Sequence, residues 1–147
     1  MRESYESGRL TAPRDIERFI TGGKAYFTVV SSDTGDRYTF KVSQKENEDG
    51  SKSPFFVSIL TGPDNWSNYR YLGTISNSGR YSHGRKSKIS DKAPSARCIS
   101  WLTMNLRDET QLARIEFWHE GRCGVCGRKL TVPESVEKGI GPVCDGR

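Results

Sequence analysis

The C-terminal segment 119–147 constrains this chain more than any other feature, because it gathers three of the four cysteines behind a histidine. The order is His119, Cys123, Cys126 and Cys144, and the short Cys-x-x-Cys spacing lets one tight turn present two sulfurs to one ion. Thiolate and imidazole are the ligands that Zn²⁺ prefers in a closed tetrahedral site. We therefore expect a structural zinc ion bound by these four side chains.

Cys98, the remaining cysteine, is the alternative to His119 as the fourth zinc ligand. Its i, i+3, i+4 spacing with Trp101 and Leu102 is that of one helix face, and it favours a buried thiol that packs as a small apolar side chain. A zinc ion with only three protein ligands would keep an open position for a water molecule. That open position is the one route to metal-assisted hydrolysis in this sequence.

Local signals inside the tail predict a compact module. Thr131 and Glu134 match a capping box, and Gly139 can end the short helix that follows. Such a helix would bring the chain back toward the first two cysteines, so that Cys144 closes the site. We expect a zinc-knuckle or treble-clef-like module over 119–147.

The preceding residues, 13–118, carry the pattern of an α+β body. Pro13 opens a short amphipathic helix that two glycines end. The β-rich runs on either side of "SDTGD" and of "GPDNW" predict two hairpins, and hence a small antiparallel sheet of four or five strands. In the second hairpin, alternation places Tyr69, Tyr71 and Ile75 on one side of the strand.

Two further segments complete the expected body. A helical pattern near 94–107 predicts a helix that covers the sheet, and the alternating residues after it predict one more strand, which leads into the zinc module. With 147 residues, 33% of them hydrophobic, the chain supports one modest core. We expect a flexible N-terminus over 1–12, the body over 13–118 and the zinc module over 119–147.

The net charge and the hydropathy of the chain indicate which kind of partner it binds and where in the cell it is located. The net charge of +5 and the sequence pI of about 9.1 favour an acidic partner such as nucleic acid. The N-terminus lacks the apolar run of a secretory signal, and no run approaches the ~20 apolar residues that a membrane-spanning helix needs. We expect a cytoplasmic protein that does not bind membranes.

A segment rich in Ser, Gly and cations, 78–92, predicts a mobile basic loop. Its cations can contact phosphates, and its Tyr81 and His83 can stack on exposed bases. Trp66 lies on a predicted turn among polar neighbours and is a candidate contact anchor. The candidate residues for binding nucleic acid or another partner are Arg80, Arg85, Lys86, Lys88, Arg122, Arg128, Lys129 and Trp66.

The tail resembles that of a family of small proteins of unknown function from bacteriophages and prophages. The shared pattern is H-x-G-R-C-x-x-C-G-R-x-L-T-x-P-x-S-x-x-x-G-x-G-P-x-C. It is matched by His119, Gly121, Arg122, Cys123, Cys126, Gly127, Arg128, Leu130, Thr131, Pro133, Ser135, Gly139, Gly141, Pro142 and Cys144. The resemblance implies a phage-associated zinc protein, and it implies no mechanism.

Three functions are compatible with these features. The first is a phage-type accessory protein that binds nucleic acid or a nucleoprotein complex in the host cytoplasm. The second is a counter-defence inhibitor, anti-CRISPR or anti-restriction, that acts by binding a host protein. The third is a zinc-dependent hydrolase or nuclease. Because His83 and His119 are the only histidines, no pair of nucleophile and base can be assembled, and we expect a binding protein without enzymatic activity.

Overall fold

The structure, a computed structural model, describes residues 9–61, 68–76 and 79–119. Within these residues the chain forms one antiparallel sheet with the strand order β1-β7-β2-β3-β4-β5-β6. The strands are β1 (Arg9–Leu10), β2 (Lys24–Ser31), β3 (Arg37–Ser43), β4 (Phe55–Leu60), β5 (Tyr69–Ile75), β6 (Tyr81–His83) and β7 (Ile115–His119). The helices are α2 (Pro13–Ile20), α3 (Pro94–Met104) and α4 (Glu109–Leu112).

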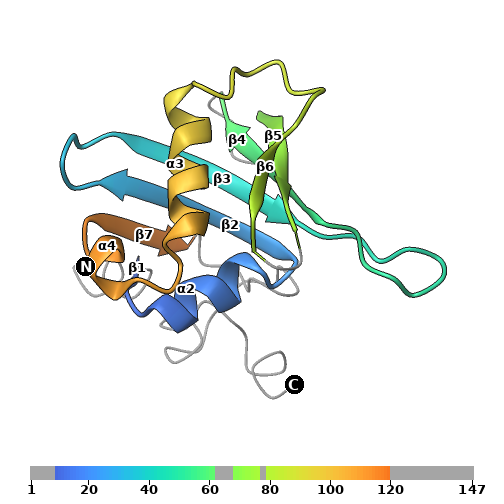
Figure 1. Cartoon of the computed structure of the whole chain (residues 1–147), viewed down its shortest axis with the longest axis horizontal. Helices are drawn as coiled ribbons and strands as arrows, with labels where there is room; N and C mark the ends of the chain where they lie inside the picture. Colours follow the sequence, from blue (N-terminus) through green and yellow to red (C-terminus); the bar gives the residue numbers. More distant parts are fainter. Residues whose placement is uncertain (1–8, 62–67, 77–78, 120–147) are drawn as a thin grey trace.

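The sheet is built from a meander and one return crossing. Strands β2 to β6 follow one another as antiparallel neighbours, and α3 then runs back across the sheet (Figure 1). This return brings β7 against the free edge of β2, where β7 also pairs with β1 on its other side. The fold is therefore α+β, as the sequence predicts. None of the helices in the described part of the chain has the length and apolar character needed to span a bilayer.

The core lies between one face of the sheet and the helices. Phe27 of β2 stacks on Phe117 of β7 with ring centroids 4.7 Å apart, and Phe19 of α2 meets both rings edge-on. From α3, Ile99 and Leu102 are fully buried against the same face. One apolar core therefore joins the central strands to α2 and α3.

Helix α3 is shorter than the predicted range of 94–107. It begins at Pro94 and ends at Met104, because the Asn105 side-chain amide donates to the carbonyl of Trp101 and turns the chain. Its buried face also differs from the one predicted from sequence. The centre of that face is Ile99 and Leu102, whereas Cys98 and Trp101 lie half-buried at its margin.

A β-bulge changes which side chains of β5 face the core. Ser58 pairs with Tyr71 and Val57 pairs with Gly73, so Leu72 is the extra residue of β5. The extra residue reverses the alternation beyond it. As a result Ile75 is buried in the core with Leu72, and the prediction that it shares a side with Tyr69 and Tyr71 is wrong.

The sheet has more strands than the sequence predicts, and both additional strands are short edges. Arg9 and Leu10 pair with Trp118 and Phe117, so these two residues are not part of a flexible N-terminus as expected, and Leu10 is buried. At the other edge Tyr81–His83 form β6 within the segment predicted to be a loop. Both edges form because a neighbouring strand offers unpaired backbone groups.

Gly73 permits the close approach of β6 to the bulge. A Cβ atom at this position would overlap the backbone carbonyl oxygen of Ser82 and lie 2.8 Å from the hydroxyl oxygen of Tyr81. We expect Gly73→Ala to lower the free energy of unfolding by about 2 kcal/mol, because a backbone oxygen cannot move aside locally. Denaturant titration measures this loss.

Gly84→Ala is the matched control for Gly73→Ala. Its Cβ atom would meet the ring of Tyr71, 37% of which is exposed and which can rotate away. We expect a smaller loss of stability for the control. Equal losses for the two variants would contradict the proposed role of the backbone contact at Gly73.

Candidate nucleic-acid interface

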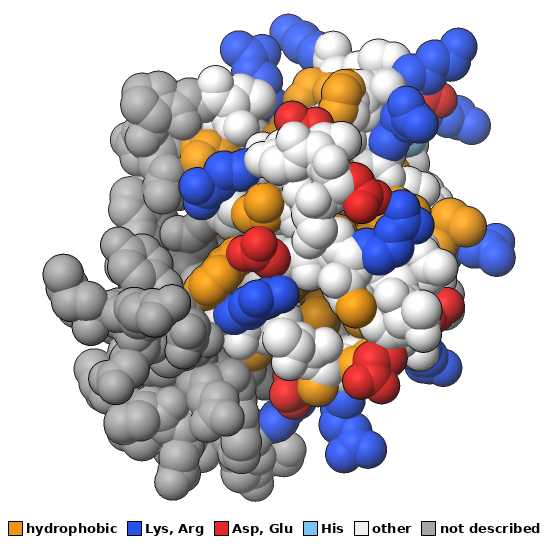
Figure 2. Space-filling view, turned by 90° about the vertical axis from the view of Figure 1, so that its left-hand side faces the viewer, with side chains coloured by type: hydrophobic (Ala, Val, Ile, Leu, Met, Phe, Trp, Pro, Cys, Tyr) orange, Lys and Arg blue, Asp and Glu red, His pale blue; other side chains and the backbone are white. Residues whose placement is uncertain are grey.

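Five cations lie on either side of β6, one immediately before the strand and four between it and α3, and we call them the basic surface. They are Arg80, Arg85, Lys86, Lys88 and Lys92, and all five are exposed. The segment that carries most of them lies at one end of the molecule, between β6 and α3 (Figure 1). Figure 2 shows that Lys and Arg side chains gather at this upper end.

The backbone beneath the basic surface is held by hydrogen bonds to β5. The Gly84 amide donates to the carbonyl of Leu72 at 3.0 Å, and the Ser87 hydroxyl donates to the carbonyl of Tyr71 at 2.9 Å. The Ile89 amide in turn donates to the Ser87 hydroxyl oxygen at 3.2 Å. The structure therefore anchors a segment that the sequence predicts to be a mobile loop.

Tyr81 and His83 are part of this scaffold. The His83 Nε2 atom lies 2.8 Å from the carbonyl oxygen of Ile89 and donates to it, so Nδ1 is free to accept from the Tyr81 hydroxyl at 2.9 Å. Burial is the main cause that raises the pKa of Tyr81 to about 12. Both rings are half-buried and their polar atoms are engaged, which argues against their predicted role in stacking on bases.

The cations of the basic surface have no ion-pair partner among the residues that the structure describes. Within the described residues, no carboxylate lies within ion-pair distance of any of the five, and the ion pairs present are Arg107 with Glu17 and Arg114 with Asp33. Asp91 is the one acidic residue within the segment. The basic surface therefore presents a positive potential to solvent.

His119 and Cys98, the two candidates for the fourth zinc ligand, belong to different elements, His119 to β7 and Cys98 to α3. His119 ends the strand, is 7% exposed, and its ring centroid lies 5.7 Å from that of Phe19. Cys98 lines a groove together with Ile115, the first residue of β7. Burial raises the pKa of the Cys98 thiol to about 12, which disfavours the thiolate that binds metals.

Most of the predicted tail and the turn tryptophan lie outside the described residues. These positions are Trp66, Arg122, Cys123, Cys126, Arg128, Lys129 and Cys144. In the described part of the chain, no three His, Cys, Asp or Glu side chains come together as a metal-binding group. The zinc ligands after His119 therefore remain predictions from sequence.

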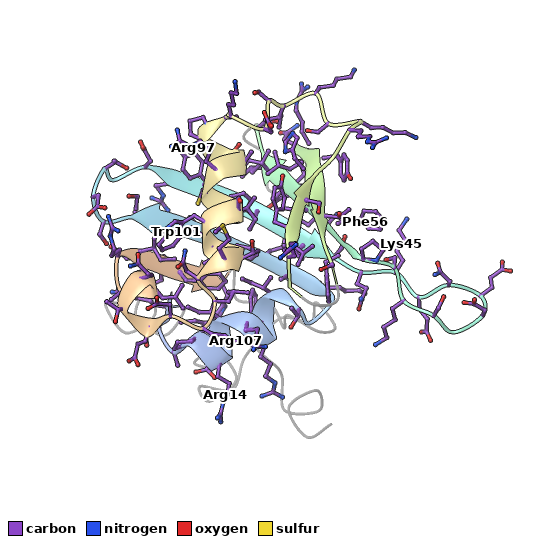
Figure 3. All side chains as sticks on the ribbon, viewed as in Figure 1. Arg14, Lys45, Phe56, Arg97, Trp101 and Arg107 are labelled. Atoms are coloured by element: carbon purple, nitrogen blue, oxygen red, sulfur yellow. The ribbon has the colours of Figure 1, made fainter. Side chains whose placement is uncertain are left out.

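A groove of about 640 Å³ lies beside the basic surface and was not predicted from the sequence. It runs between α3 and the β2–β3 hairpin, and Trp101 and Tyr38 contribute aromatic rings to its lining. Arg97 and Trp101 lie one turn apart on α3 and point to the same side of it (Figure 3). The helical pattern alone places Trp101 on the buried face of the helix, whereas in the structure its side chain is half-buried.

Tyr81→Phe tests whether the scaffold depends on the phenol. We expect a loss of about 1 kcal/mol in the free energy of unfolding near neutral pH, because the hydrogen bond to His83 is lost. The folded-state pKa is raised, so the phenol's contribution is complete below pH 10 and is lost as the pH rises from 10 toward 12. The difference between the two proteins should shrink over that range in denaturant titrations, and a difference that grows there would be inconsistent with this account.

Residues 116–147 match DUF6011, which is described as a family of unknown function. The matched segment begins at Glu116 and therefore includes the part of β7 that ends with His119. No curated protein and no solved structure matches the chain. The C-terminal segment, together with the end of β7 that precedes it, is thus similar to a family that has no assigned activity.

Proposed function

We propose that this protein binds nucleic acid, alone or within a nucleoprotein complex, through the basic surface. The observation that carries the proposal is the set of five exposed cations, without carboxylate partners among the described residues, on a backbone fixed by hydrogen bonds to β5. Phosphate neutralisation by such cations releases counterions and supplies most of the affinity in sequence-independent binding. A place among phage or prophage accessory proteins rests on the resemblance of the tail.

The same proposal includes a structural zinc ion held by His119, Cys123, Cys126 and Cys144. The position of His119 supports this ligand set, because it ends β7, a strand paired on both sides, shortly before the cysteines in sequence, and its ring lies beside that of Phe19. Cys98 fits less well, since its thiol is kept neutral by burial and lies toward the other end of β7. When bound, the ion would crosslink the tail to the sheet.

Neutralising part of the basic surface tests nucleic-acid binding. In a variant with Arg85→Gln, Lys86→Gln and Lys88→Gln, three phosphate contacts are lost, so the slope of log affinity against log salt should fall by about two to three. Fluorescence anisotropy with labelled single-stranded and duplex oligonucleotides at several salt concentrations measures both the slope and the affinity. Unchanged binding by this variant would reject the proposed surface.

A control variant with Arg14→Gln, Lys24→Gln and Lys45→Gln removes the same charge from other exposed sites. Figure 3 shows Arg14 and Lys45 far from the upper end of the molecule. This control should retain nearly the full slope. If both variants lose it equally, net charge and not the basic surface governs binding.

Metal analysis of three variants tests the zinc ligands. His119→Phe keeps the ring packing with Phe19 but removes the ligand, so zinc content should fall from about one ion per chain, whereas His119→Cys should retain it. Cys98→Ala should leave the content unchanged. Loss of zinc from Cys98→Ala, with retention in His119→Phe, would instead identify Cys98 as the fourth ligand.

A further inference from the structure

The groove beside the basic surface has an aromatic lining and a polar rim. Tyr38 of β3 and Trp101 of α3 supply rings, and Val29 and Ile115 supply apolar surface from the strands. Burial, followed by the nearby Asp36 carboxylate, raises the pKa of Tyr38. The volume of about 640 Å³ lies within the range of small-molecule binding sites.

The rim of the groove carries charged side chains that can donate or accept hydrogen bonds. Among the described residues, these side chains have no ion-pair partner. The guanidinium of Arg97 is exposed, and no carboxylate lies within ion-pair distance of it. Asp36 and Asp91 likewise have no cation at that distance, although Asp36 accepts a hydrogen bond from the Thr34 hydroxyl. By contrast, Asp33 is neutralised by Arg114 at 2.7 Å.

The groove is continuous with the basic surface along the chain. Asp91 and Pro94, which line the groove, flank the exposed Lys92 of the basic surface, and Arg97 follows on the first turn of α3. A strand whose phosphates contact the basic surface would therefore pass the open side of the groove. An aromatic slot next to a row of cations is the arrangement that binds single-stranded nucleic acid.

We propose that this groove receives one unpaired base of a bound nucleic-acid strand and favours bases that carry an exocyclic amino group. The base stacks on Trp101, and the carboxylates of Asp36 and Asp91 accept hydrogen bonds from its amino group. Arg97 contacts the adjoining phosphate. Thymine and uracil lack the amino donor, so they bind the same slot less well. This inference rests on the proposed function, because it requires a strand on the basic surface.

The test compares three labelled single-stranded oligonucleotides of about ten residues, namely oligo-dC, oligo-dT and an abasic strand. Anisotropy with the full-length zinc-bound chain should give the order oligo-dC, oligo-dT, abasic, from tightest to weakest. Trp101→Leu should weaken oligo-dC binding about tenfold and leave the abasic strand unchanged. Replacing Asp36 and Asp91 by Ala should abolish the preference for oligo-dC over oligo-dT, whatever happens to overall affinity.

Two further variants show whether a loss of binding comes from the groove itself. They distinguish it from a folding defect and from the loss of a tryptophan at another site. Ser100 lines the groove, so Ser100→Phe should block it without removing a side chain from the core, and should weaken oligo-dC binding as Trp101→Leu does. Trp118→Leu removes the same side chain from β7, where alternation with the buried Phe117 places it on the opposite face of the sheet. This control should bind all three strands like the unmodified chain.

The outcomes distinguish a failure of the base-binding groove from a failure of the proposed nucleic-acid binding. If no strand binds at low salt, the proposed function itself is wrong. Equal binding of oligo-dC and the abasic strand, with no effect of Trp101→Leu or Ser100→Phe, would leave the basic surface in place and reject the base slot. In that case a protein segment becomes the better occupant of the groove, since Met104 on its rim is 81% exposed.

Discussion

The contact between Phe27 and Phe117 is the interaction on which the rest of the architecture depends. It joins β2 to β7, two strands that the chain reaches at opposite ends of the described residues, and Phe19 covers the pair from α2. Because β7 is drawn into the sheet beside β2, α3 must cross the same face on the way. The crossing of α3 then creates the groove, and the end of β7 fixes where the tail begins.

The position of the basic surface depends on a different constraint, at the far edge of the sheet. The extra residue Leu72 bends β5, and Gly73 admits the backbone of Ser82, so that β6 can pair there. From β6 the segment is tied to β5 through Gly84 and Ser87. A short, twisted edge strand bearing polar residues also discourages pairing with other chains. The bulge and Gly73 thus allow β6 to form the last strand of the sheet, and they fix the position of the segment that carries the cations.

Sequence patterns were sufficient where one periodicity dominated and failed where a contact distant in sequence decided the outcome. The β-rich runs around "SDTGD" gave the β2–β3 hairpin, because nothing interrupts the ladder there, and in the structure Phe40 and Val42 of β3 are buried in the core. Alternation failed at Ile75, because the β-bulge opposite Val57 and Ser58 of β4 adds one residue to β5, and the pattern of β5 alone does not contain that pairing. For Trp101, helical spacing identified the apolar face of the helix. Only the packing of α3 on the sheet shows which edge of that face remains exposed to solvent.

The candidate binding surface and the proposed zinc ligand lie on separate parts of one rigid sheet. Strands β2, β3, β4 and β5 stand between β7 and β6, a separation of roughly 24 Å at the usual strand spacing. His119 is therefore remote from the cations that flank β6. Because the backbone under the cations is already ordered by its bonds to β5, binding a strand has to order only side chains. An anchored edge can consequently hold a flexible polyanion at a lower entropic cost than a mobile loop with the same charge.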